Sequence, residues 1–129
     1  MIGEKQTKTD LGKIKIHIKA IRSMAAIATM EVDGVLRIYT GTIGKLFDMI
    51  GKDSNAAAIK VDLKENNEIG LAVSIVVEYG QDIPKIAGLV QENIRRAIEG
   101  MSGLNPNTID VKIKSIEKSL PQSKQGGKE

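Results

Sequence analysis

Few side chains in this chain could do chemistry. Its 129 residues include one histidine, His17, and no cysteine. A single imidazole excludes a histidine-based metal cluster within one chain, and the lack of thiols excludes disulfides, thiolate metal sites and a cysteine nucleophile. His17 lies among lysines in an alternating run, which favours a solvated strand residue over a general base. With no Walker loop or dinucleotide motif in the sequence, we predict a protein that is not an enzyme and has no cofactor or metal.

A Gly-x-x-Gly run at residues 41–44 has the spacing of the loop with which KH domains clamp nucleotides. Its central Thr42 and Ile43 carry no positive charge, so a turn that starts a short helix is the favoured interpretation. Single-strand stacking is disfavoured as well, because no aromatic side chains interleave with the lysines. Nucleic acid is therefore the least favoured partner.

Lysines recur on the polar sides of the predicted strands. If these strands share one sheet, the lysines form a basic face beside Asp62 and Asp110. We favour a solvated face that protects edge strands from aggregation, with an anionic partner as the alternative. The formal net charge of +3 permits such a partner without requiring it. The candidate basic face consists of Lys13, Lys15, Lys60, Lys64, Lys112 and Lys114.

Hydrophobic periodicity predicts the elements that must position these residues. Alternation predicts strands at residues 13–18, 59–63, 69–79 and 108–116, and spacing of three and four residues predicts long helices at 19–32 and 83–102. A short amphipathic helix is expected at residues 43–50. The second long helix has the clearest boundaries, because Asp82 and Pro84 suit its first turn and Gly103 suits its end.

The connection between the strands at 59–63 and 69–79 has a predictable length. A two-residue turn at Asn66 and Asn67 would pair Leu63 with Gly70 and place the two apolar sets on opposite faces. A loop with an odd number of residues pairs Leu63 with Ile69 instead. We therefore expect three or five connecting residues, with an asparagine in the left-handed region.

The element order predicts an α+β fold with two layers. The economical layout is a mixed β-sheet with two long helices on one face, a split βαβ or ferredoxin-like arrangement, plus the short inserted helix. One sheet face should consist of Ile14, Ile16, Ile59, Val61, Leu63, Leu71, Val73, Ile75, Val111 and Ile113.

We expect one domain at residues 13–117. Residues 1–12 are polar and aperiodic, and residues 118–129 combine Pro, Gly, Ser and Lys, so flexible segments are expected at both ends. No stretch approaches the roughly 18 apolar residues of a membrane span, and the first residues lack the apolar region of a secretory signal. A cytoplasmic protein is therefore predicted.

Two apolar segments exceed what a two-layer core requires. The centre of the first long helix has almost no polar face, and the short helix adds two large side chains. Core packing and an interface explain this surplus about equally well. We expect a homo-oligomeric contact on a candidate interaction surface of Met24, Ala26, Ile27, Phe47 and Met49.

Several uncommon choices recur in order within residues 75–104. They are Val76-Val77-Glu78-Tyr79-Gly80, Ile83-Pro84, Ala87, Val90-Gln91-Glu92-Asn93, Ala97, Glu99, Met101, Gly103 and Leu104. This run resembles the signature of the alkaline-shock-protein family of envelope stress response proteins, typical of Gram-positive bacteria. Residues 13–35 are similar more loosely, and they depart where Ile18 and Lys19 replace a small residue and a Pro-acidic pair. The resemblance covers about residues 13–116.

The resemblance implies a small cytoplasmic protein without known catalysis. Members are linked to envelope stress and, for some, to lipid metabolism; some self-associate and act near the membrane through an anchored protein partner. The expected function is therefore a non-catalytic envelope stress response protein that acts through protein–protein contacts and self-association. The alternative is an adaptor or regulator of an enzyme of fatty-acid metabolism.

Overall fold

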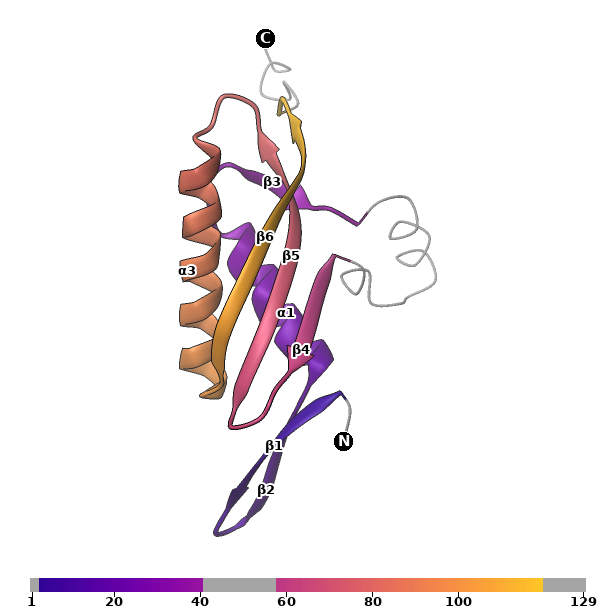
Figure 1. Ribbon diagram of the computed structural model, residues 1–129, viewed down its shortest axis with the longest axis vertical. Coiled ribbons are helices and arrows are strands. Elements are labelled where there is room, and N and C mark those ends of the chain that lie inside the picture. The colour runs from indigo at the N-terminus through magenta and orange to yellow at the C-terminus, as the bar shows by residue number, and fades with distance from the viewer. Residues whose placement is uncertain (1–2, 41–57, 120–129) are drawn as a thin grey trace, which may run out of the picture.

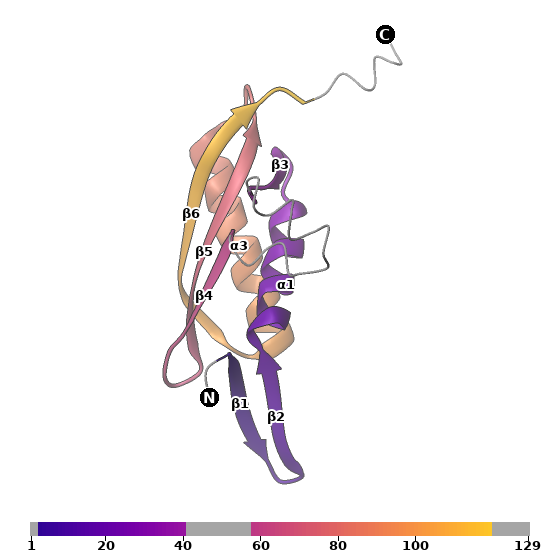
Figure 2. The same cartoon turned by 90° about the vertical axis from the view of Figure 1, so that its right-hand side faces the viewer.

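The computed structural model describes residues 3–40 and 58–119. Within these residues the chain forms two helices and two sheets of an α+β fold, and both helices cover one face of the larger sheet (Figures 1 and 2). The predicted two-layer fold class is confirmed. The elements are β1 (Glu4–Thr9), β2 (Gly12–His17), α1 (Ile18–Met30), β3 (Val35–Ile38), β4 (Ile59–Leu63), β5 (Glu68–Glu78), α3 (Ile83–Ser102) and β6 (Asn105–Glu117).

The larger sheet is built around β5. Strands β3 and β4 both pair antiparallel with β5, and β6 pairs with it in parallel. The sheet is therefore mixed, and α3 is the crossover that joins the parallel strands β5 and β6. Two register shifts in β6 and one in β3 mark bulges in this ladder.

The β4–β5 hairpin has the predicted register. Leu63 pairs with Ile69, so the apolar side chains of both strands face the helices. The connecting residues include Asn66 and Asn67, which have φ angles of 58° and 64°. Asparagine tolerates this left-handed region better than most residues, which explains why the loop can turn here.

Helix α3 has the boundaries that its sequence predicts. The Asp82 carboxylate accepts a hydrogen bond from the Lys85 backbone N–H at 3.3 Å, and Pro84 lies in the first turn. Gly103 ends the helix with a φ of 75°. These caps satisfy backbone groups that the helix itself leaves unpaired.

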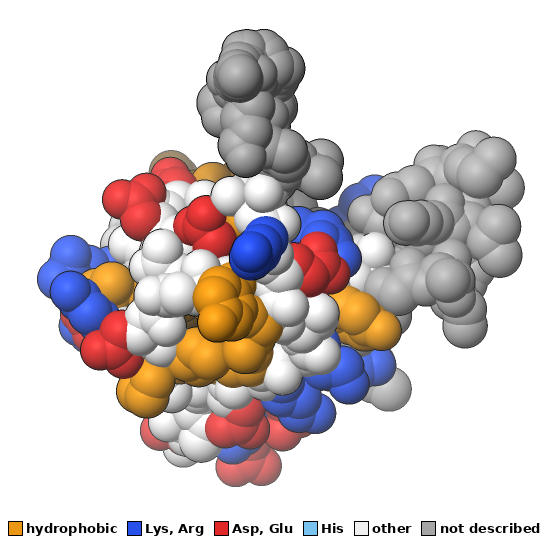
Figure 3. Space-filling view, turned by 90° about the horizontal axis from the view of Figure 1, so that it is seen from above, with side chains coloured by type: hydrophobic (Ala, Val, Ile, Leu, Met, Phe, Trp, Pro, Cys, Tyr) orange, Lys and Arg blue, Asp and Glu red, His pale blue; other side chains and the backbone are white. Residues whose placement is uncertain are grey.

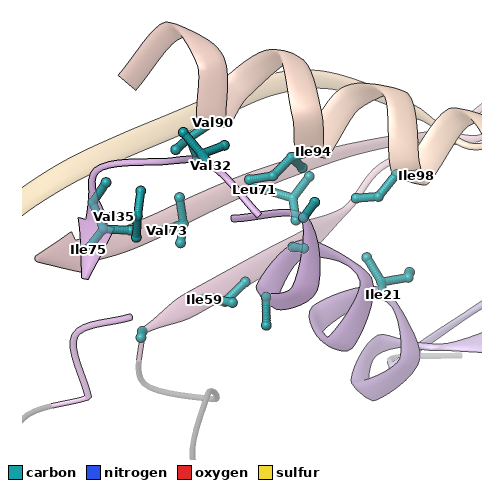
Figure 4. Packing of buried hydrophobic residues seen from close by; sticks show 14 of the residues in the cluster. Ile21, Val32, Val35, Ile59, Leu71, Val73, Ile75, Val90, Ile94 and Ile98 are labelled. Carbon is teal, nitrogen blue, oxygen red and sulfur yellow. The ribbon is translucent and has the colours of Figure 1, made fainter. Parts of the chain in front are cut away.

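The core lies between the helices and the inner face of the larger sheet (Figure 4). Val73 and Ile75 of β5 are fully buried against α1 and α3. Helix α3 contributes side chains at every fourth position, namely Ile86, Val90, Ile94 and Ile98. Met101, three residues after Ile98, is by contrast 71% exposed.

The N-terminal region differs from the prediction. Residues 4–9 form β1, where no regular structure was expected, and β1 pairs only with β2 in a separate two-stranded sheet. The strand predicted at residues 13–18 is therefore not part of the larger sheet, and Ile14 is 54% exposed rather than lining the core. The larger sheet contains β3 instead of the predicted strand at residues 13–18. Hydrophobic periodicity did not reveal β3, because this strand is only four residues long.

Two earlier expectations remain as predictions. The short helix predicted at residues 43–50 lies outside the described residues. The domain boundaries at 13 and 117 are not tested by the fold, although the β1–β2 hairpin gives residues 4–9 a regular structure.

Candidate interaction surface

An apolar groove lies between α1 and α3. It has a volume of about 570 Å³ and is lined mainly by apolar side chains. The lining residues are Ala20, Ser23, Met24, Ile27 and Ala28 of α1, Glu31 directly after it, and Ala97 and Met101 of α3. Small side chains form its hollow, while Ile27 and Met101 are 64% and 71% exposed.

The two walls of this groove are held at a fixed spacing by Asn93 of α3. Its amide donates to the Ala28 carbonyl of α1 at 2.8 Å and to a Glu31 carboxylate oxygen at 3.3 Å. The opposite side of α1 packs into the core through Ile21 and Ala25. The groove is therefore a built feature of the fold, because both helices are anchored beneath it.

The structure divides the predicted interaction residues. Met24 and Ile27 line the groove together. Ala26 is only 9% exposed and belongs to the core, so it is not part of this surface. Phe47 and Met49 lie outside the described residues. Met101 was not among the predicted interaction residues, although it lines the same groove.

Further apolar side chains gather at the end of the molecule where β5, β6 and the start of α3 meet (Figure 3). Tyr79, just after β5, and Ile116, near the end of β6, are exposed there. The Lys118 ammonium lies 6.0 Å from the centroid of the Tyr79 ring. Charged side chains surround this patch.

The predicted basic face does not exist as one surface. Lys13 and Lys15 lie on the separate β1–β2 hairpin, whereas Lys60 and Lys112 lie on the outer face of the larger sheet. Lys64 follows β4 directly. The prediction assumed that all alternating strands share a sheet, and β2 does not.

The outer face of the larger sheet is mixed in charge. Lys60 and Asp110 flank Ala72 in the same row, and Asp62 and Thr108 flank Gly70 in the next. They surround a shallow depression of about 200 Å³. Lys114 stands 5.6 Å from the centroid of the Tyr39 ring. The lysines here have acidic neighbours, so the face offers no uniform field to an anionic partner.

One ion pair spans this outer face. The Arg37 guanidinium of β3 donates two hydrogen bonds, at 2.8 and 3.0 Å, to the Glu117 carboxylate of β6. These bonds hold the pKa of Glu117 below its ordinary value and raise that of Arg37. Because β5 lies between β3 and β6, the pair links both edges of the sheet across its central strand.

Comparison with known protein families shows to which family this chain belongs. Residues 6–118 match the profile of the alkaline shock protein 23 family, which is described as having a cell envelope-related function. The chain belongs to this family. The resemblance predicted from residues 75–104 is thereby confirmed, and the match also includes most of the β1–β2 hairpin.

Two proteins from Bacillus subtilis (strain 168) are similar to this chain. The protein YqhY is 38% identical over 109 residues, which cover 84% of this chain and 80% of the relative. YloU is 21% identical over 118 residues, or 90% of this chain and 98% of the relative. Among solved structures, two MamM-CTD variants align with TM-scores of 0.47 and 0.45 at 14% and 16% identity, covering 77% and 80% of this chain and 98% and 95% of those chains.

This family member shows little sign of a reactive centre in its described residues. The His17 side chain is 72% exposed, and its Nε2 lies 3.8 Å from a Glu4 carboxylate oxygen. Within residues 3–40 and 58–119, no group of three or more His, Cys, Asp or Glu side chains could hold a metal ion. Neither helix in that part of the chain is long and apolar enough to cross a membrane.

Proposed function

We propose that this alkaline shock protein family member is a non-catalytic binding module of the cell envelope response that works by self-association. The observation that carries the proposal is the apolar groove between α1 and α3, with Ile27 and Met101 exposed beside it. A second copy of the chain is the proposed occupant. Burying an aliphatic side chain of this size contributes about 1.5–3 kcal/mol, so a few such side chains can hold a dimer.

The shape of the groove supports a contact between identical copies. Protruding Ile27 and Met101 and the hollow at Ala20 and Ala97 lie on the same surface. In a two-fold contact, the protruding side chains of each copy meet the hollow of the other. Alanines and Ser23 let the helix backbones approach closely, which favours helix-on-helix packing over a polar interface.

Exposure of His17 supports the non-catalytic part of the proposal. A general base acts on a substrate that lies within hydrogen-bonding reach. His17 is largely surrounded by solvent, and the groove that could receive another molecule offers Ser23 and Glu31 as its polar side chains. We place this activity in the cytoplasm, near the membrane when a membrane-anchored protein recruits the module.

The test is light scattering coupled to size exclusion over a wide range of protein concentrations. We expect the mass to rise from monomer to dimer, and Ile27→Glu to hold the protein at monomer mass because it buries an unpaired charge. Ile116→Glu is the matched control, since it places the same charge at another exposed isoleucine. A monomer mass at every concentration contradicts self-association.

The second candidate is an adaptor for another protein, such as an enzyme of fatty-acid metabolism. The same groove favours it, because an amphipathic helix of a partner would fill the space between α1 and α3. A monomeric protein that binds a partner at equal molar amounts, and loses this binding in Ile27→Glu, supports the adaptor over the homo-oligomer.

A further inference from the structure

The β1–β2 hairpin projects from the body of the molecule as an arm of residues 4–17 (Figures 1 and 2). Its base is tied down: Lys5 donates to the Lys64 carbonyl, and the Ile18 N–H donates to the Gly3 carbonyl at 2.6 Å. Most of its remaining residues are exposed. Isolated two-stranded hairpins are marginally stable in water, so this arm has little of its own to hold it rigid.

One face of the arm concentrates positive charge. Lys8 and Lys13 lie directly opposite each other in the register, and Lys15 is on the same face. Like charges in directly opposed positions destabilise a strand pair. Glu4 lies 3.7 Å from Lys15, whereas no ion pair holds Lys8 or Lys13 among the described residues. These two lysines therefore present their charge to the solvent without an acidic partner among the described residues.

The tip of the arm adds apolar surface to this charge. Leu11, in the turn, is completely exposed, and Ile14 of the opposite face is 54% exposed. Leu11 lies beyond Lys8 and Lys13, which are the lysines nearest the turn on the two strands. The arm thus ends in an apolar side chain with lysines immediately behind it, and Asp10 is the one acidic residue at this end.

We propose that this arm docks on an anionic lipid surface, with Leu11 entering the interfacial region while Lys8, Lys13 and Lys15 meet the headgroup phosphates. Lipid recognition by clustered lysines combines electrostatic attraction with apolar burial, and the arm presents both at one end. A nucleic acid would satisfy the lysines but not Leu11, and the arm has no aromatic side chain on which a base could stack. This inference does not depend on the α1–α3 groove.

Vesicle sedimentation of the full-length protein tests the charge requirement. We expect binding to phosphatidylcholine vesicles that contain phosphatidylglycerol, no binding to phosphatidylcholine alone, and release at about 1 M salt, where screening acts within a few ångströms. The double variant Lys8→Gln/Lys13→Gln should bind roughly 25-fold more weakly, and Leu11→Ser about tenfold more weakly. The matched control Lys60→Gln/Lys112→Gln removes the same charge from the sheet and should bind as the native protein does.

Fluorescence tests insertion of the tip. The chain contains no tryptophan, so Leu11→Trp introduces a single reporter at the turn. Its emission should shift to shorter wavelengths on anionic vesicles and be quenched by brominated lipid. Tyr79→Trp, at the opposite end of the molecule, should show neither change.

Several results overturn the proposal. One is the absence of binding to anionic vesicles at low salt, and another is equal loss of binding in the arm and sheet double variants. Arm-dependent binding to nucleic acid or to an acidic protein, without vesicle binding, would assign the lysines to a different partner. If Lys8→Gln/Lys13→Gln lowered the oligomer mass measured by light scattering, the arm would instead belong to a contact between copies of the chain. Circular dichroism spectra must match across the variants.

Discussion

The turn that leaves α1 depends on a glycine whose replacement has a calculable effect. Gly34 has a φ of 99°, and a Cβ added there would overlap Ile86 Cδ1 and lie 3.3 Å from the Gln81 side-chain oxygen. Ile86 is almost fully buried, so its end cannot move aside without displacing neighbours in the core. Gly34→Ala therefore combines an unfavourable backbone conformation with overpacking between the α1–β3 turn and α3.

Gly80 supplies the matched control. Its φ is 96°, and nothing lies within 4 Å of an added Cβ. Gly80→Ala should cost about 1 kcal/mol for the backbone conformation. Gly34→Ala should cost about 1–3 kcal/mol more, the usual range for overpacking. The gain from a stiffer unfolded chain is similar in both variants and cancels in their difference.

Urea denaturation and thermal melting measure the stability of both variants. For a chain of this size, a loss of 1 kcal/mol in the free energy of unfolding lowers the melting temperature by about 4 °C. Ile86→Val removes the clashing methyl group and alone costs about 1 kcal/mol. In Gly34→Ala/Ile86→Val, about 1–2 kcal/mol should be recovered as coupling between the two positions. Equal losses in Gly34→Ala and Gly80→Ala, or additive effects in the double variant, would refute the packing of Ile86 against this turn.

Three further predictions follow from single contacts. Val73→Asp places an unpaired charge in the fully buried centre of β5 and should leave the protein unfolded by circular dichroism; an unchanged melting temperature would contradict the assigned strand faces. Asp82→Ala removes the N-terminal cap of α3 and should lower the free energy of unfolding, measured by urea denaturation, by about 1 kcal/mol. An unchanged free energy of unfolding would mean that water can replace Asp82 as the partner of the Lys85 N–H. The ion pair with Arg37 lowers the pKa of Glu117 in the folded protein below 4.5, so the pair stabilises the fold above about that pH, and the stabilisation is lost as the pH falls through the lowered pKa. In Arg37→Gln the melting temperature should therefore fall less steeply as the pH is lowered through this range. The same slope in the native protein and in Arg37→Gln would count against the pair.

Local chemistry explains which elements could be predicted from the sequence. The caps of α3 depend on Asp82 and Gly103 alone, and the β4–β5 register follows from the parity that pairs Leu63 with Ile69. Strand β1 was missed because its Lys, Gln and Thr side chains give no apolar alternation, although its partner β2 has it. The membership of a strand in one sheet or another is a non-local property that periodicity does not contain.

The candidate surface was partly predictable for the same reason. The excess of apolar residues on α1 left core packing and an interface as alternatives, and the structure places Ile27 in the groove with 64% of it exposed. The excess could not show that Ala26 is buried and Ile27 exposed, because the positions of the sheet and of α3 determine which side of α1 is covered. Met101 lines the groove from α3, and its exposure could not be predicted from α3 alone, because it depends on how α1 lies beside that helix.

The central position of β5 also determines when the larger sheet can form during protein synthesis. Every other described strand of that sheet pairs with β5, so β3 and β4 emerge from the ribosome before their partner does. Until residue 78 has emerged, Ile21 and Ala25 of α1 have no sheet to cover them. Nascent chains stalled before residue 68 should therefore be sensitive to proteases and bind chaperones, and protection should appear only after β5 has left the exit tunnel.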